Sequence, residues 1–99
     1  MRARLVLIED DIGVATRALD GKGLVVGRDP SADWTLLGRN LSRHHVSVEP
    51  LDEAGHRLRD LSSTNGTRLN GELLREPARL RSGDIISLGD EVTLIYELD

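Results

Sequence analysis

Short runs of aliphatic residues, separated by glycine and asparagine turns, are the feature that most constrains how this chain folds. The run at 92–98 alternates, so that Val92, Leu94, Tyr96 and Leu98 fall on one face. Alternation at period two is typical of a strand with one buried face. The strand candidates are residues 4–8, 23–26, 34–37, 45–49, 56–61, 67–69, 73–74, 85–88 and 92–98. Many short strands predict an all-β fold, a sandwich of two antiparallel sheets with about ten or eleven strands.

Turn residues stand between these runs. Asn70-Gly71 separates residues 67–69 from the next apolar pair, and it predicts a type I′ hairpin because both turn positions need positive φ. Ser82-Gly83-Asp84 and Gly89-Asp90 predict further turns. Residues 12–19 are helix-like, but Gly13 weakens a helix. We interpret them as a loop or the start of a second strand.

Length and composition predict one domain over residues 1–99. The chain has 38% hydrophobic residues, 30% charged residues and no cysteine. The absence of cysteine excludes disulfides, cysteine zinc sites and thiol catalysis. It fits a reducing, cytoplasmic compartment, with a secreted protein without cysteine as the alternative. The apolar run at residues 5–8 is far too short to span a membrane. A net charge of −4 argues against nucleic acid as a partner.

The charge is unevenly distributed along the chain. Residues 22–45 carry four basic and two acidic side chains, which gives this segment a charge of +2 on an otherwise acidic chain. A local basic region suits a small anionic ligand better than a polyanion.

Four segments combine arginine, hydroxyl and amide side chains next to predicted strands. They are residues 27–29, 41–45, 60–67 and 69–71. Loops at one end of a rigid sandwich commonly carry binding residues, so we expect all four segments to meet at one end. Guanidinium groups match phosphate oxygens, and hydroxyl or backbone N–H donors complete such a site.

The order of these segments resembles the forkhead-associated (FHA) domain family. The matching pattern is Gly27-Arg28, then Ser42-Arg43-x-His45, then Asp60-Leu61-x-Ser63-Thr64-Asn65-Gly66-Thr67, then Leu69-Asn70-Gly71, followed by residues 80–89. The resemblance extends over residues 23–98. It implies an Arg-cluster reader of phosphorylated protein segments.

The resemblance implies a role for each motif residue that meets the ligand. Arg28 contacts the phosphate, Ser42 donates its hydroxyl to another phosphate oxygen, and Arg43 adds charge or a backbone N–H. Thr64 shapes the pocket for the threonine methyl group. Asn65 bonds the backbone of the bound peptide.

Other motif residues are architectural in the family. By resemblance, His45 braces the ligand loop and Gly27 permits its turn. Gly66, Asn70 and Gly71 supply turns.

Two neighbours of the motif, Arg39 and Asn40, stand where the family often reads the peptide beyond the phosphothreonine. His44 occupies the variable motif position and faces either solvent or ligand.

Two rival chemistries use the same residues. Ser42, His45 and Asp60 are the elements of a hydrolytic triad, but no nucleophile elbow accompanies them. His44, His45 and His56 are potential metal ligands, but adjacent strand residues point to opposite faces.

The sequence therefore predicts a phosphothreonine-dependent interaction module that is not an enzyme and uses no metal or cofactor. Its expected partner is a phosphothreonine-containing protein, the substrate of a Ser/Thr kinase, and it binds no membrane. The isolated domain is expected to be a monomer. The alternative is an FHA-fold scaffold or dimerisation unit that acts without phosphate.

Overall fold

The computed structural model describes residues 2–52 and 55–99, which form eleven strands and no helix. The strands are β1 (Ala3–Glu9), β2 (Ile12–Leu19), β3 (Leu24–Gly27), β4 (Trp34–Thr35), β5 (Val46–Pro50), β6 (His56–Asp60), β7 (Thr67–Leu69), β8 (Glu72–Leu73), β9 (Ala78–Arg79), β10 (Ile85–Leu88) and β11 (Val92–Leu98). Within these residues no helix is long and apolar enough to cross a membrane.

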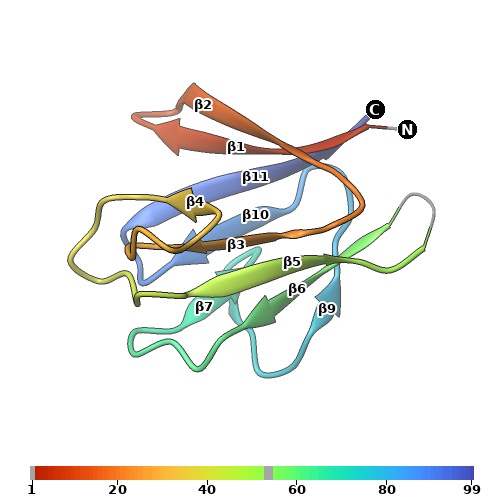
Figure 1. Ribbon diagram of the computed structural model, residues 1–99. Helices are drawn as coiled ribbons and strands as arrows, with labels where there is room; N and C mark the ends of the chain where they lie inside the picture. Colours follow the sequence, from red (N-terminus) through yellow and green to blue (C-terminus); the bar gives the residue numbers. More distant parts are fainter. Residues whose placement is uncertain (1, 53–54) are drawn as a thin grey trace.

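The strands form two sheets that pack face to face (Figure 1), as the all-β prediction required. The six-stranded sheet has the order β2-β1-β11-β10-β7-β8, and the five-stranded sheet has the order β4-β3-β5-β6-β9. One short pair departs from the antiparallel prediction. β4 runs parallel to β3, with Val26 opposite Trp34, because the loop of residues 28–33 carries the chain back beside β3.

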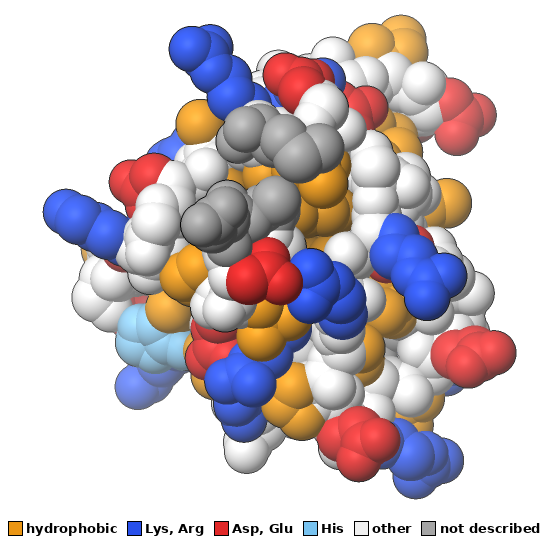
Figure 2. Space-filling model, turned by 90° about the vertical axis from the view of Figure 1, so that its right-hand side faces the viewer, with side chains coloured by type: hydrophobic (Ala, Val, Ile, Leu, Met, Phe, Trp, Pro, Cys, Tyr) orange, Lys and Arg blue, Asp and Glu red, His pale blue; other side chains and the backbone are white. Residues whose placement is uncertain are grey.

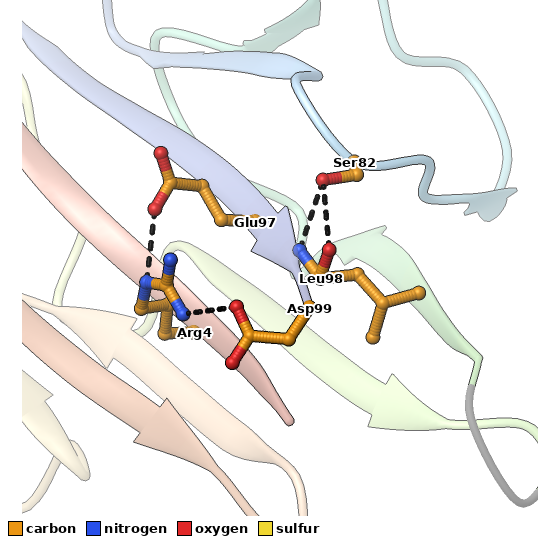
Figure 3. A network of polar contacts seen from close by, with 5 residues as sticks. All are labelled: Arg4, Ser82, Glu97, Leu98 and Asp99. Carbon is orange, nitrogen blue, oxygen red and sulfur yellow. Dashed lines mark hydrogen bonds and ion pairs between the residues drawn. The ribbon is translucent and has the colours of Figure 1, made fainter. Parts of the chain in front are cut away.

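Strand β11 lies between β1 and β10, so the two ends of the chain meet in one sheet. Figure 3 shows the hydrogen bonds and ion pairs that join β1 and β11 near the chain ends. Arg4 Nε donates to Glu97 at 2.9 Å, and its Nη1 donates to Asp99 at 2.9 Å. Ser82 Oγ accepts the Leu98 N–H at 2.9 Å. The Arg4–Glu97 contact is partly buried and the other two are exposed. Ion pairs so near the surface contribute about 1 kcal/mol or less.

Aliphatic side chains fill the space between the sheets. Both sheets contribute fully buried residues, which are Leu5, Val26, Val46, Val48, Leu58, Ile86, Leu88, Leu94 and Tyr96. Trp34 is also buried. The expected alternation in β11 is confirmed, since Val92, Leu94 and Tyr96 are buried.

A polar pair crosses the core. His56 Nδ1 lies 2.8 Å from the Tyr96 hydroxyl, and the rings pack edge to face at 5.6 Å. His56 comes from β6 and Tyr96 from β11, so the contact joins the two sheets. Burial lowers the pKa of His56 below its usual 6.5 and raises the pKa of Tyr96 above 10.0.

Two local predictions need revision. Residues 12–19 form a complete strand, because β1 supplies a long partner that overrides their helix-like composition. The expected strand at 34–37 ends at Thr35, and Leu37 is exposed. In β5 both faces are partly covered, since Ser47 is buried as well as Val46 and Val48.

The end of the sandwich that carries the chain termini is shown face on in Figure 2. Acidic and basic side chains are interspersed there, with hydrophobic side chains between them. The side chains coloured in this view form no broad basic surface of the kind that nucleic-acid binding needs.

Candidate functional site

Loops gather at the opposite end of the sandwich from the termini, on the left of Figure 1. They are the β3–β4 loop (residues 28–33), the β4–β5 loop (36–45), the β6–β7 loop (61–66) and the β10–β11 turn (89–91). Backbone bonds join them: Arg28 N–H donates to Ser42 O at 3.1 Å, and Gly89 N–H donates to Gly66 O at 3.0 Å. The loops therefore form one connected surface.

His45 is the buried centre of this surface, with none of its area exposed. Its Nδ1 accepts the Ser42 N–H at 3.1 Å, and its Nε2 lies 2.8 Å from Gly66 O. Because a carbonyl oxygen only accepts, Nε2 must carry the proton, and the ring is the neutral tautomer. One imidazole thus joins the β4–β5 loop to the β6–β7 loop.

Gly27 allows these loops to approach β3. A Cβ at this position would lie 2.0 Å from Arg43 O and 2.9 Å from His44 Cα. Its φ is not among the positive values, so the requirement is space and not the turn that the family resemblance suggested. Any side chain here would push the Ser42-Arg43 segment outward.

Arg28 and Ser42 lie side by side through this arrangement. Arg28 is exposed, and its Nε donates to Leu41 O at 2.8 Å, which fixes the plane of the guanidinium. The four N–H donors on Nη1 and Nη2 take no part in that bond. Ser42 Oγ accepts the Thr64 N–H at 2.9 Å, so its own O–H remains a donor. Arg43, the next residue, is exposed.

The β6–β7 loop is shaped by one carboxylate. Asp60 accepts the Ser63 hydroxyl and backbone N–H, and also the Thr67 hydroxyl at 2.6 Å. Burial alone would raise the pKa of Asp60, but these hydrogen bonds outweigh it and hold the pKa below the usual 3.8. The left-handed residues of the loop are Ser62 and Gly66, with φ of 57° and 84°.

Asn65 is therefore not the left-handed turn residue, although it precedes a glycine. It is exposed, and its Nδ2 donates to Asn40 O at 3.1 Å. Thr64 is exposed beside it, bonded to Ser42. The structure thus brings together the predicted phosphate residues and the predicted peptide residues.

A residue that sequence reasoning missed supports Asn40. Glu91, in the β10–β11 turn, accepts the Asn40 N–H at 2.9 Å. Gly89 also contacts this segment, since a Cβ there would lie 2.5 Å from Asn40 O. No local signal identifies Glu91, because its partner is 51 positions away and reaches it only in the folded state. Arg39 is exposed next to Asn40.

His44 lies at the edge of the surface and not in the centre. Its Nε2 is 2.9 Å from Ser31 Oγ, and Ser31 donates to Asp29. The Ser31 hydroxyl and backbone N–H lower the pKa of Asp29 below its usual 3.8.

One predicted segment lies elsewhere. Asn70 and Gly71 form the β7–β8 turn with positive φ, as the hairpin prediction required. However, Asn70 bonds to Asp84 and to Ile85 at the start of β10, away from Gly66 and Gly89. The prediction that all four segments meet at one end is wrong for this one, because β7 carries the chain away from the site.

Neither rival chemistry finds its geometry here. In a hydrolytic triad the histidine would bond the serine hydroxyl and the carboxylate. Here both His45 nitrogens bond backbone groups, and Ser42 Oγ accepts the Thr64 N–H. Asp60 accepts hydrogen bonds within the β6–β7 region. His56 lies with Tyr96 in the core. Within residues 2–52 and 55–99, no group of three His, Asp or Glu side chains is placed to hold a metal ion.

Comparisons with known proteins identify the family of this fold. The FHA domain family model matches residues 24–89. Human proliferation marker protein Ki-67 is 40% identical over 64 residues, which is 65% of this chain and 2% of that protein. FhaA of Mycobacterium tuberculosis is 31% identical over 88 residues, covering 89% of this chain and 16% of that protein. The chain thus spans a small part of these relatives.

Solved structures repeat the fold. The FhaA FHA domain, complexed with the intracellular domain of Rv3910, is 32% identical with a TM-score of 0.83, over 96% of this chain and 99% of that one. The N-terminal FHA domain of S. cerevisiae Rad53p, in complex with a phosphothreonine peptide, is 26% identical with a TM-score of 0.82. That match covers 100% of this chain and 94% of the other.

Proposed function

Since this chain belongs to the FHA domain family, we propose that it is a phosphothreonine-dependent interaction module that binds phosphorylated protein segments through its loops. The observation that carries this proposal is the juxtaposition of Arg28, Ser42, Thr64 and Asn65 on one exposed surface braced by His45. The partner is a protein phosphorylated by a Ser/Thr kinase. The module acts by binding, without catalysis, in cytoplasmic signal transduction.

The phosphate chemistry follows from which donors the fold leaves available. The Leu41 carbonyl holds Arg28 at Nε, so Nη1 and Nη2 serve as a fork for two phosphate oxygens. Ser42 accepts from Thr64 and donates its hydroxyl hydrogen to a third oxygen. Arg43 adds positive charge close to the same group.

The peptide chemistry uses the neighbouring loop. Asn65 presents an amide that donates and accepts, which suits a bond to the backbone of an extended peptide. Thr64 lies between Asn65 and Ser42 and forms the wall against which the methyl group of phosphothreonine packs. Asn40 and Arg39 stand where the peptide leaves the phosphate.

The test is an oriented library of phosphothreonine peptides with phosphoserine and unphosphorylated counterparts of each sequence. Calorimetry on the selected peptide should give binding to the phosphothreonine form, weaker binding to phosphoserine and none to the unphosphorylated form. Equal binding of the unphosphorylated form would establish the phosphate-independent scaffold instead.

A further inference from the structure

One leucine in the β4–β5 loop is almost completely exposed. Leu37 has 95% of its surface accessible, whereas the other exposed large hydrophobic residues among those described range from 41% to 63%. A single exposed leucine is ordinary on a protein surface. Leu37, however, borders a groove.

The groove is formed by three segments that meet at the loop end of the sandwich. Its lining residues are Leu7, Glu9, Thr35, Leu36, Leu37 and Val92. Its volume is ≈ 240 Å³, less than the ~300–1,000 Å³ of pockets that enclose small molecules. It therefore has the size for a side chain of a partner protein and not for a cofactor.

The groove shares two connections, the β4–β5 loop and the β10–β11 turn with the residue that follows it, with the phosphopeptide surface. Leu37 lies in the same loop as Asn40 and Ser42. On the other side, Val92 follows Glu91, which bonds the Asn40 N–H. Figure 1 shows the β1–β2 turn and the β4–β5 loop at the same end of the molecule. An extended peptide advances about 3.3 Å per residue, so a few residues beyond the phosphothreonine carry a partner onto the groove.

Charge defines the chemistry of the occupant further. Glu9 lines the groove, and Asp10 and Asp11 follow it in the β1–β2 turn, where all three are exposed. This acidic edge contrasts with the basic region at Arg28 and Arg43. A basic residue of the partner is attracted to it, and an acidic one is repelled.

We propose that the phosphothreonine partner also inserts an aliphatic side chain, flanked by a basic residue, into the groove at Leu37. The inference rests on the proposed function and adds a second contact outside the phosphate site. The aliphatic side chain packs on Leu37, Leu7 and Val92, and the basic residue lies against Glu9.

The experiment uses the phosphothreonine peptide selected above, in a short form and in forms extended at each end. A Leu-Lys pair is placed at successive positions of the extension, with Ser-Ser and Leu-Glu at the same positions as controls. One Leu-Lys position should bind about 4- to 10-fold more tightly than Ser-Ser, as expected for burying roughly half a leucine side chain. Leu-Glu at that position should bind more weakly than Leu-Lys.

Two variants locate the contact. Leu37→Ser should abolish the gain from Leu-Lys and leave the affinity for the short peptide unchanged, because Leu37 is 95% exposed in the free protein and contributes little to its core. Leu51→Ser, at the other end of the sandwich and 41% exposed, is the matched control and should change neither value.

Each contrary outcome is distinct. If the short peptide fails to bind, the proposed function is wrong and the groove proposal falls with it. If the short peptide binds but no extension binds more tightly, the groove proposal alone is overturned. Self-association of the free protein that Leu37→Ser abolishes, measured by sedimentation, would assign the groove to a second copy and also overturn it.

Discussion

Replacing Arg28 by lysine should weaken phosphopeptide binding strongly although the positive charge is kept. The Arg28 guanidinium has two roles. Its Nε donates to Leu41 O at 2.8 Å, and its Nη groups, which take no part in that bond, donate to the phosphate in the proposed complex. A lysine ammonium is a single donor centre. It cannot hold the Leu41 carbonyl and bond two phosphate oxygens from the same position.

The magnitude follows from the bonds that change. Losing one of the two charge-assisted bonds to phosphate costs about 1.5–3 kcal/mol of binding free energy, which corresponds to a roughly 10- to 150-fold rise in Kd. Losing the Leu41 bond lowers the free energy of unfolding by about 0.5–1.5 kcal/mol. The variant should therefore remain folded and lose mainly affinity.

Calorimetry with the phosphothreonine peptide measures the rise in Kd, and urea unfolding measures the loss in the free energy of unfolding. Arg4→Lys is the matched control, because Arg4 makes two ion pairs near the surface at the end opposite the site. It should leave the affinity unchanged. An Arg28→Lys protein that binds as tightly as the parent would refute the fork geometry and reduce Arg28 to a simple source of charge.

Further predictions concern the ligand methyl group and two titrating residues. Phosphothreonine should bind about 4- to 30-fold more tightly than phosphoserine by calorimetry, because the Thr64 wall buries one methyl group and the β-branched side chain loses less rotamer freedom. Asp60→Asn should lower the free energy of unfolding at pH 7 by about 1–3 kcal/mol. Since the pKa of Asp60 is lowered in the folded state, its stabilisation is present above the unfolded value and is lost as the pH falls through the folded value. Urea unfolding should therefore show the difference between the parent and the variant shrinking as the pH falls below 3.8. Because burial lowers the folded pKa of His56 below 6.5, the unfolded state binds the proton first, and stability should fall as the pH drops from 7 towards 5, by at most about 1.4 kcal/mol per pH unit. His56→Gln should flatten this dependence in the same assay.

The sequence predicts those parts of this structure that depend on local chemistry. The alternation in β11 and the Asn70-Gly71 hairpin follow from side-chain period and backbone preference, and both are confirmed. The parallel β3–β4 pair does not follow from them, because strand direction depends on the path of the intervening loop. For β2 the composition leaves a loop and a strand open, and its partner β1 decides for the strand.

The residues of the site also fall into a group that the sequence predicts and a group that it does not. Arg28, Ser42 and Asn65 are identified by residue type and order, and the fold brings them to one surface. The groups that hold the site residues in place do not follow from the sequence. Glu91 accepts the Asn40 N–H from a segment that is distant in sequence. The Leu41 group that accepts from Arg28 is a backbone carbonyl, which residue type does not reveal. Sequence order identifies the groups that meet a ligand more readily than the groups that hold them in place.

The position of β11 between β1 and β10 has a consequence for how fast this protein folds. Ala3 pairs with Leu98, so the centre of the six-stranded sheet joins residues from the two ends of the chain. The entropy of closing so long a loop is lost before that pairing stabilises anything. Sandwiches dominated by such contacts fold in about milliseconds to seconds. The β1–β2 hairpin contributes Leu5 and Leu19 to the core, but it joins the rest of its sheet only through β11. Refolding of a chain that ends before β11 should therefore fail, however intact its binding loops are in sequence.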